Sequence, residues 1–240
     1  MRKIFIFVSI IAVLAFGTAA VYALKPSAIR GERSVEDVVA AYEADVLGRL
    51  SGAAIIKDKK YPEKLLIYAD KKTQMLFAYG MADGKFQLIK AYKFTAMSGH
   101  AGPKLKEGDR QIPEGIYRLE SFNPNSRYHL SLRVSYPDKF DRDMAKRDGR
   151  ALKNLGGDIM IHGKAATIGC IPIGDPGIEE LFVIAAKTGK ENAEILISPQ
   201  NLLKDENVSA LGKQPAWYPE LCANIKAKMQ EYEKLGVAFF

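Results

Sequence analysis

Cysteine, histidine and tryptophan are scarce in this 240-residue chain, which holds two cysteines, three histidines and one tryptophan. Two cysteines, Cys170 and Cys222, cannot build a disulfide-rich scaffold or a four-cysteine zinc site. The sequence also lacks Ser-x-x-Lys, Gly-x-Ser-x-Gly, His-Glu-x-x-His and a Walker loop. These absences leave penicillin-binding serine enzymes, serine hydrolases, zincins and P-loop nucleotidases without their reactive groups.

The overall composition is that of a globular protein. Apolar residues make up 48% of the chain and charged residues 26%, which argues against disorder and allows one large domain or two small ones. The net charge of +7 is scattered among acids and fits a solvated surface, or attraction to an anionic polymer such as a cell wall. The basic clusters lack a recognition-motif context, so no nucleic-acid partner is expected.

The N-terminus has the parts expected of an export signal. Arg2 and Lys3 precede an uncharged run, and Val21 and Ala23 fit the −3 and −1 positions of a cleavage site. A cleaved signal peptide over residues 1–23 is favoured, and an uncleaved inner-membrane anchor is the alternative. In both cases we expect an exported, periplasmic protein.

Hydrophobic periodicity and turn signals predict short strands in the middle of the chain and helices towards its ends. Ser34 caps the first predicted helix, Asp83-Gly84 joins two strands, and Asp175 is expected to cap a helix that Gly189 ends. The predicted helices cover 34–50, part of 138–153, 175–189 and the tail from 217; the predicted strands cover 65–69, 74–79, 85–96, 116–122, 128–134, 158–162, 170–173 and 194–197. The fold class is therefore mainly β with peripheral helices (α+β).

His162 and Cys170 lie eight residues apart, separated by a loop with glycine at both ends. If 158–162 and 170–173 are neighbouring strands, the imidazole returns towards the thiol and lowers its pKa, as a thiol nucleophile requires. The N–H groups of Gly169 and Cys170 could then face a developing oxyanion. A buried structural cysteine beside an unrelated histidine is the alternative.

The segment Ile161-His162-Gly163, followed by Thr167-Ile168-Gly169-Cys170-Ile171, resembles the signature of the L,D-transpeptidase (YkuD-domain) family. The stretch 104–117 resembles the family's Gly-Asp-x-x-Thr-Pro-x-Gly-x-Tyr pattern, with Ile112 where threonine is usual, and 122–142 resembles its murein L,D-transpeptidase-like branch. The resemblance covers residues 63–198 and implies the β-sandwich catalytic domain of that family. A helical or linker segment, 24–62, would precede this domain, and a helical extension, 199–240, would follow it.

The resemblance implies that Cys170 is the nucleophile, His162 its general base, and the Gly163 carbonyl the group that orients the imidazole. The implied substrate is the stem peptide of peptidoglycan, attacked through a Cys170 thioester, with no metal or organic cofactor. Two alternatives remain. One is a hydrolase of the same fold that cuts links between peptidoglycan and an attached lipoprotein, and the other is a non-catalytic wall-binding module.

Two positions depart from the family pattern. Ile168 stands where many members have histidine before Gly-Cys, and Pro172 stands where many have a substrate-binding arginine. Arg127, His129 or Arg133 could replace that arginine if the strand 128–134 borders the site. The loop between His162 and Cys170 is also shorter than in many members. A shorter loop could admit water or a bulky protein-linked substrate, so the hydrolase remains an alternative to the transpeptidase.

The remaining histidines and the second cysteine have less specific contexts. His129 is either a substrate contact or a half-buried strand residue, and His100 is expected to be solvated. Cys222 is expected in the core, because a disulfide to Cys170 would quench the nucleophile. A zinc site of His162, Cys170 and His129 is disfavoured, since closely spaced ligand pairs are missing.

Overall fold

The computed structural model describes residues 32–240 except 54–55, 57–60, 206 and 209–211, so the expected export segment lies outside the described residues. Residues 32–240 form one compact unit. Its helices are α1 (Val35–Arg49), α2 (Lys139–Arg147), α3 (Gly174–Thr188) and α4 (Tyr218–Lys234), with short 3₁₀ turns at Leu152–Asn154 and Lys190–Asn192. Its strands are β1 (Lys64–Asp70), β2 (Met75–Ala82), β3 (Lys85–Lys93), β4 (Gly115–Asn123), β5 (Ser131–Val134), β6 (Met160–His162), β7 (Ile171–Pro172) and β8 (Ala193–Ser198).

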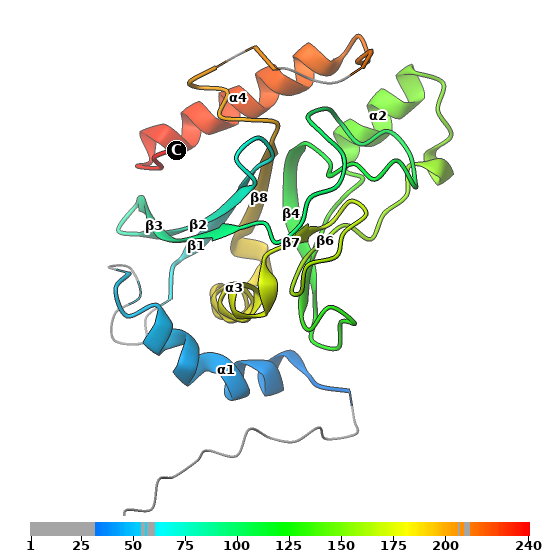
Figure 1. Ribbon diagram of the computed structural model, residues 1–240. Helices are drawn as coiled ribbons and strands as arrows, with labels where there is room; N and C mark the ends of the chain where they lie inside the picture. Colours follow the sequence, from blue (N-terminus) through cyan, green and yellow to red (C-terminus); the bar gives the residue numbers. More distant parts are fainter. Residues whose placement is uncertain (1–31, 54–55, 57–60, 206, 209–211) are drawn as a thin grey trace, which may run out of the picture. The chain divides into compact units, whose positions relative to one another are not determined.

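The strands form one mixed sheet in the order β3-β2-β1-β8-β4-β5-β6-β7 (Figure 1). Two neighbouring pairs, β1–β8 and β6–β7, are parallel, and the other pairs are antiparallel. The sheet curls into a half-barrel because β4 pairs with β8 over its first half and with β5 over its second. The α+β class predicted from the sequence is confirmed.

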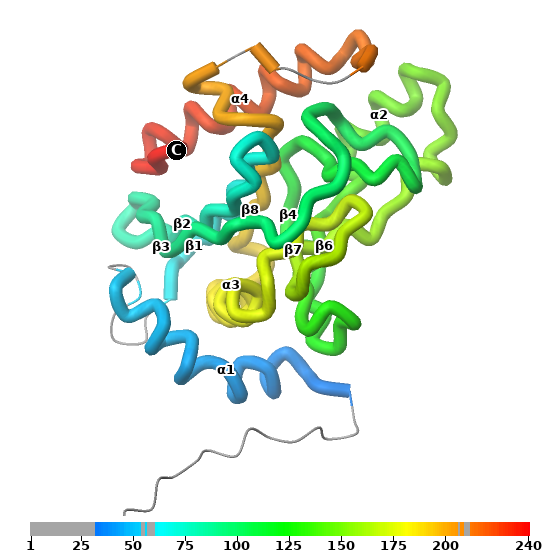
Figure 2. The backbone as a smooth tube through the Cα atoms, in the orientation of Figure 1, coloured from blue at the N-terminus to red at the C-terminus, as the bar shows by residue number. Residues whose placement is uncertain are grey.

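Helices cover both faces of the sheet, and each face has its own core. On one face α3 packs under the sheet with α1 outside it; on the other face α4 crosses β1, β2 and β8 (Figures 1 and 2). Alternate residues of β1 divide between the faces: Leu65 and Ile67 join the first cluster, while Leu66 and Tyr68 join the second. A strand buried on both faces reads as a continuous apolar run, which is how this segment appears in the sequence.

Several element boundaries follow from local chemistry. The Ser34 hydroxyl accepts the Asp37 N–H while the Asp37 carboxylate accepts the Ser34 N–H, so α1 begins with a capping box. Asp83 and Gly84 both have positive φ, as a two-residue hairpin turn requires. Gly189 ends α3 at a φ of 89°, which glycine adopts without strain. These predictions are confirmed.

Two sequence expectations are wrong in detail. The strand expected over 128–134 begins only at Ser131, because His129 has a φ of 76° and turns the chain before the strand starts. Asp175 does not cap α3; Ile173 is the N-cap residue and has no side-chain bond to the helix. The Asp175 carboxylate instead accepts the N–H of Lys164 in a neighbouring loop.

Candidate active site

Strands β6 and β7 place His162 and Cys170 on one face of the sheet. The strands run parallel, with Ile161 opposite Ile171 and His162 opposite Pro172. The same register sets Cys170 beside Met160, and a residue and its partner two positions along a strand share a face. Cys170 therefore lies one residue before β7, opposite Met160 and two positions along the register from His162.

The imidazole of His162 is held in one orientation. Its Nδ1 lies 2.5 Å from the Gly163 carbonyl oxygen, and the side chain is buried beneath the Tyr128 ring, 4.5 Å between ring centroids. A carbonyl oxygen can only accept, so Nδ1 carries the hydrogen and Nε2 keeps the lone pair of the neutral ring. Burial lowers the pKa of His162 and the bond to Gly163 partly opposes this, so the ring is a neutral base near pH 7.

The thiol of Cys170 makes two backbone contacts at the start of β6. Its Sγ donates to the Asp158 carbonyl at 3.6 Å and accepts the Met160 N–H at 3.4 Å. Burial raises the pKa of Cys170; the Met160 N–H and the Lys104 charge oppose this shift, while Asp158 adds to it. The expectation of a lowered thiol pKa is therefore wrong for the free protein. The resting site pairs a thiol with a neutral imidazole.

The turn before Cys170 is fixed by Thr167. The Thr167 hydroxyl donates to the Cys170 carbonyl at 2.7 Å and accepts the Gly169 N–H at 3.1 Å. The expected oxyanion donor Gly169 thus already has a partner. Position 169 requires glycine for two reasons. Its φ is 135°, and an added Cβ would lie only 3.0 Å from the Gln111 carbonyl oxygen.

Comparisons with known proteins agree with this geometry. The L,D-transpeptidase catalytic domain model (YkuD) matches residues 64–192, more than half of the chain. The chain belongs to the L,D-transpeptidase family. YafK of Escherichia coli (strain K12), described as a candidate L,D-transpeptidase, is 30% identical over 166 residues, which cover 65% of this chain and 64% of YafK. The chain thus spans less than two thirds of that relative.

The solved structures found are more distant. The helical cell shape determining protein Pgp2 of Campylobacter jejuni is 22% identical, with a TM-score of 0.45, covering 69% of this chain and 54% of Pgp2. Bd1075 of Bdellovibrio bacteriovorus is 19% identical, with a TM-score of 0.41, covering 74% of this chain and 58% of Bd1075.

The three residues considered as substitutes for the family's arginine lie in different surroundings. The His129 Nε2 lies 2.9 Å from Glu179 on α3, and its ring packs edge-on against Tyr42 of α1. Arg127 is exposed, and its carbonyl accepts the Lys164 ammonium. Strand β5 does border the site, because Ser131 pairs with His162.

Arg133 is the substitute candidate with a link to the thiol. It contacts the carboxylates of Glu120 at 2.8 Å and Asp158 at 2.5 Å, and the Asp158 carbonyl accepts from Cys170. Its guanidinium is thus tied to the residue beside the nucleophile. Arg133 thus already pairs with two carboxylates of this chain, and a role in binding substrate stays a prediction for all three residues.

The apolar residues around the pair do not all shield it from water. Ile161 and Ile171 are fully buried, but Ile168 is 76% exposed. Ile168 therefore does not cover the thiol, because the loop carries its side chain outward.

The other histidine and cysteine are set apart from the catalytic pair. His100 is half-buried, and both its ring nitrogens lie within 3.3 Å of the Gln111 side-chain amide, so it is not simply solvated. Cys222 is a free, half-buried thiol that lines a groove of about 670 Å³ along α4. Within the described ranges, no group of three or more His, Cys, Asp or Glu side chains could hold a metal ion.

A buried ion pair supports the loop that meets Gly169, and the sequence analysis missed it. Lys71, at the end of β1, donates to Glu114 at 2.7 Å and to the carbonyls of Gly102 and Ile112. The second Glu114 oxygen accepts the Tyr218 hydroxyl of α4 at 2.8 Å. The only sequence signal was a lysine directly after an apolar strand, which is usually a solvated residue.

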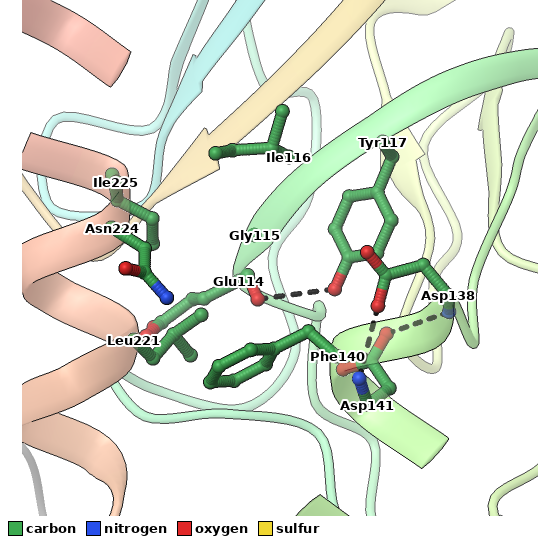
Figure 3. Close-up of a pocket in the computed structure, with 10 residues that line it drawn as sticks. All are labelled: Glu114, Gly115, Ile116, Tyr117, Asp138, Phe140, Asp141, Leu221, Asn224 and Ile225. Atoms are coloured by element: carbon green, nitrogen blue, oxygen red, sulfur yellow. Dashed lines mark hydrogen bonds between the residues drawn. The ribbon is translucent and has the colours of Figure 1, made fainter. Parts of the chain in front are cut away.

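A small cavity of about 70 Å³ lies between β4, α2 and α4 (Figure 3). Figure 3 shows Asp138 and Asp141 on one wall, and the Tyr117 hydroxyl donating to the Glu114 carbonyl at 3.0 Å. Burial and the neighbouring Asp138 charge raise the pKa of Asp141 to about 8. The lining residues do not include His162 or Cys170, so this cavity is separate from the candidate active site.

Proposed function

We propose that this protein is a cysteine-dependent L,D-transpeptidase that acts on peptidoglycan stem peptides through a Cys170 thioester. One observation carries the proposal. The Gly163 carbonyl fixes the His162 ring so that Nε2 is its basic nitrogen, and the Cys170 thiol bonds to the N–H of Met160, two residues before His162 on β6. A positioned neutral base beside a thiol is the arrangement that nucleophilic acyl transfer needs.

In the proposed reaction the Cys170 S–H turns from the Asp158 carbonyl towards His162. Nε2 takes the proton as sulfur attacks the carbonyl at the L-centre of the diamino acid. The tetrahedral oxyanion collapses, the C–N bond breaks, and the imidazolium gives its proton to the departing amine. An acceptor amine then attacks the thioester, His162 takes its proton, and the thiol is restored.

The raised pKa of the thiol is consistent with this order of events. A thiol that is neutral at rest transfers its proton in the same step that forms the C–S bond, so the base must already be neutral. The backbone N–H of Met160 already bonds to sulfur and would favour the thiolate as it forms. No metal or organic cofactor has a part in this scheme.

The experiment mixes the full chain with peptidoglycan that carries tetrapeptide stems and bound lipoprotein, with Cys170→Ala as the control. Mass spectrometry of the released peptides resolves the products. New cross-linked or amine-exchanged peptides, absent with Cys170→Ala, would support the transpeptidase. Equal products from both proteins would refute both enzymatic proposals and leave a non-catalytic wall-binding module.

A hydrolase of the same fold is the second candidate, and the exposed loop favours it. Lys164, Ala165, Ala166 and Ile168 are exposed between the base and the nucleophile. Water or a bulky protein-linked substrate could reach an acyl-enzyme that has no cover on this side. Release of the bound lipoprotein without new cross-links would support the hydrolase over the transpeptidase.

We also propose that the protein is exported to the periplasm, where peptidoglycan lies. Peptidoglycan stem peptides are the proposed partner, and a peptidoglycan-linked lipoprotein is the further partner of the hydrolase alternative. Among the residues that the structure describes, no helix is both long and apolar enough to cross a bilayer. The division into an N-terminal segment, a catalytic domain over 63–198 and a helical extension over 199–240 remains a proposal.

A further inference from the structure

One peptide group lies between the candidate base and an acidic side chain. The carbonyl of the Gly163–Lys164 peptide accepts from His162 Nδ1 at 2.5 Å, and its N–H donates to Asp175 Oδ1 at 2.8 Å. A peptide group is planar and rigid, so the bond made by its N–H sets the direction of its carbonyl. The Asp175 carboxylate and the His162 imidazole therefore bond to opposite sides of the same peptide group.

The space around this peptide is closed to any residue larger than glycine. A Cβ at Gly163 would lie 2.5 Å from Asp175 Oδ1 and 2.7 Å from the Tyr128 carbonyl oxygen. The Gly163 N–H donates to the carbonyls of Tyr128 and Leu130 at 3.1 and 3.3 Å. The close approach of the Asp175 carboxylate is thus a reason why the residue after His162 is glycine.

The next residue is held in an unfavourable conformation. Lys164 has a φ of 57°, its carbonyl accepts the Thr95 hydroxyl at 2.5 Å, and its ammonium donates to the Arg127 carbonyl at 2.6 Å. A non-glycine residue at positive φ persists only where its surroundings fix it. The contacts from Asp175, Thr95 and Arg127 are those surroundings.

Asp175 is directed to this peptide and does not cap its own helix. It lies in the first turn of α3, where Ile173 is the N-cap residue without a side-chain bond. An aspartate at a helix start ordinarily accepts N–H groups of its own helix. Here the Asp175 Oδ1 instead accepts the N–H of Lys164, in the loop between His162 and Cys170.

We propose that Asp175 is a positioning residue for His162, acting through the Gly163–Lys164 peptide; this rests on the function proposed above. The carboxylate polarises the peptide N–H, which strengthens the carbonyl as an acceptor for Nδ1–H. As Nε2 takes the thiol proton, the imidazolium gains a stronger bond to this carbonyl. An aspartate that orients a catalytic histidine through a direct bond is well known; here a peptide group stands between them.

The first test is nitrogen NMR of the histidine side chains in the full chain, with His162 assigned from the spectrum of His162→Gln. Wild type should show the Nδ1–H tautomer of His162. Asp175→Ala should show a mixture of tautomers, while Asp175→Asn, which keeps an acceptor but loses the charge, should retain Nδ1–H with a weaker hydrogen bond. An unchanged His162 signal in both variants would overturn the proposal. This measurement needs no substrate.

The second test is a double-mutant cycle on the reaction with tetrapeptide-stem peptidoglycan. Asp175→Ala should lower kcat about 100-fold with little change in KM, and Asp175→Asn about 10-fold. In a His162→Ala background, Asp175→Ala should have no further effect, because it acts through the imidazole. Equal losses in both backgrounds would assign Asp175 a general structural role and overturn the proposal.

Glu220→Ala is the matched control, since Glu220 is a first-turn carboxylate on α4 that forms an ion pair with the exposed Arg147 at 3.2 Å. It should leave both kcat and the His162 spectrum unchanged. If the peptidoglycan reaction is absent in wild type but the NMR change is present, the proposed function fails and the positioning role stands. If activity is present and neither the spectrum nor kcat responds to Asp175, the positioning role alone fails.

Discussion

The Sγ of Cys170 donates to the Asp158 carbonyl at 3.6 Å, two residues before the strand that ends in His162. The thiol of the proposed nucleophile is therefore bonded to the backbone that leads into β6, the strand that carries the proposed base. Burial raises the pKa of this thiol above its ordinary value. In the proposed reaction Cys170 is therefore a thiol at rest, and His162 takes its proton only as sulfur reaches a substrate.

The raised thiol pKa predicts the pH dependence of Cys170 alkylation. In a Cys222→Ser background, the rate with iodoacetamide should be low at pH 7, rise about tenfold per pH unit from there and level off only above pH 9, since the thiolate is the reacting species and the pKa of Cys170 is raised from 9.0. The measurement is loss of free thiol against pH by mass spectrometry. A rate that levels off below pH 7 would show a thiolate–imidazolium pair and contradict this account.

The buried Lys71–Glu114 pair predicts a large stability cost when one partner is removed. Lys71→Met leaves the Glu114 carboxylate buried without its cation, and we expect a loss of about 3–5 kcal/mol in the free energy of unfolding. Urea unfolding followed by circular dichroism measures it. Lys72→Met is the matched control: Lys72 is 60% exposed and pairs loosely with Asp205 at 3.5 Å, so its loss should cost at most about 1 kcal/mol. Equal costs for the two variants would contradict the assignment.

Asp141 predicts that stability falls as the solution becomes alkaline. Its pKa is raised to about 8 in the folded protein from an ordinary 3.8, so the folded state binds the proton more tightly than the unfolded state. The resulting stabilisation is fully present below pH 3.8 and is lost as the pH rises through about 8. Tm measured from pH 5 to 9 should decline less in Asp141→Asn than in wild type. Asp143→Asn, on the exposed side of α2, should keep the wild-type decline; the same slope in all three proteins would refute the prediction.

Ile168 tests whether the exposed loop contacts a substrate. Because its side chain is 76% exposed, Ile168→Ser should leave Tm within about 2 °C of wild type. If a substrate covers the side chain, KM should rise about 10- to 100-fold, since burying an isoleucine contributes about 1.5–3 kcal/mol. Steady-state kinetics on stem-peptide fragments measure both constants. An unchanged KM would remove Ile168 from the binding surface.

The sequence predicted those features that depend on near neighbours in the chain. The Ser34 cap, the Asp83-Gly84 turn and the Gly189 stop each rest on a few adjacent residues, and the His162 to Cys170 spacing led to the pairing of two short strands. The family signature carried the rest of the site, because it encodes a fold that periodicity alone does not specify.

Features set by distant contacts were missed or misassigned. Asp175 has the sequence context of a helix cap, and only the folded loop at Lys164 shows where its carboxylate goes. The thiol pKa depends on burial, on the Met160 N–H and on the charges of Asp158 and Lys104, which no spacing reveals. Lys71 has the sequence context of a surface lysine, and its ion-pair partner Glu114 lies more than forty residues away in the sequence.

The central claim, a covalent intermediate on Cys170, is tested most directly by the intact mass of the protein. The full chain would be mixed with a tetrapeptide-stem fragment of peptidoglycan, quenched in acid within seconds and analysed by mass spectrometry, beside Cys170→Ala and Cys222→Ala. The account predicts one added acyl group, on Cys170, in wild type and Cys222→Ala, and none in Cys170→Ala. Product formation without any adduct, or an adduct that survives in Cys170→Ala, would contradict it.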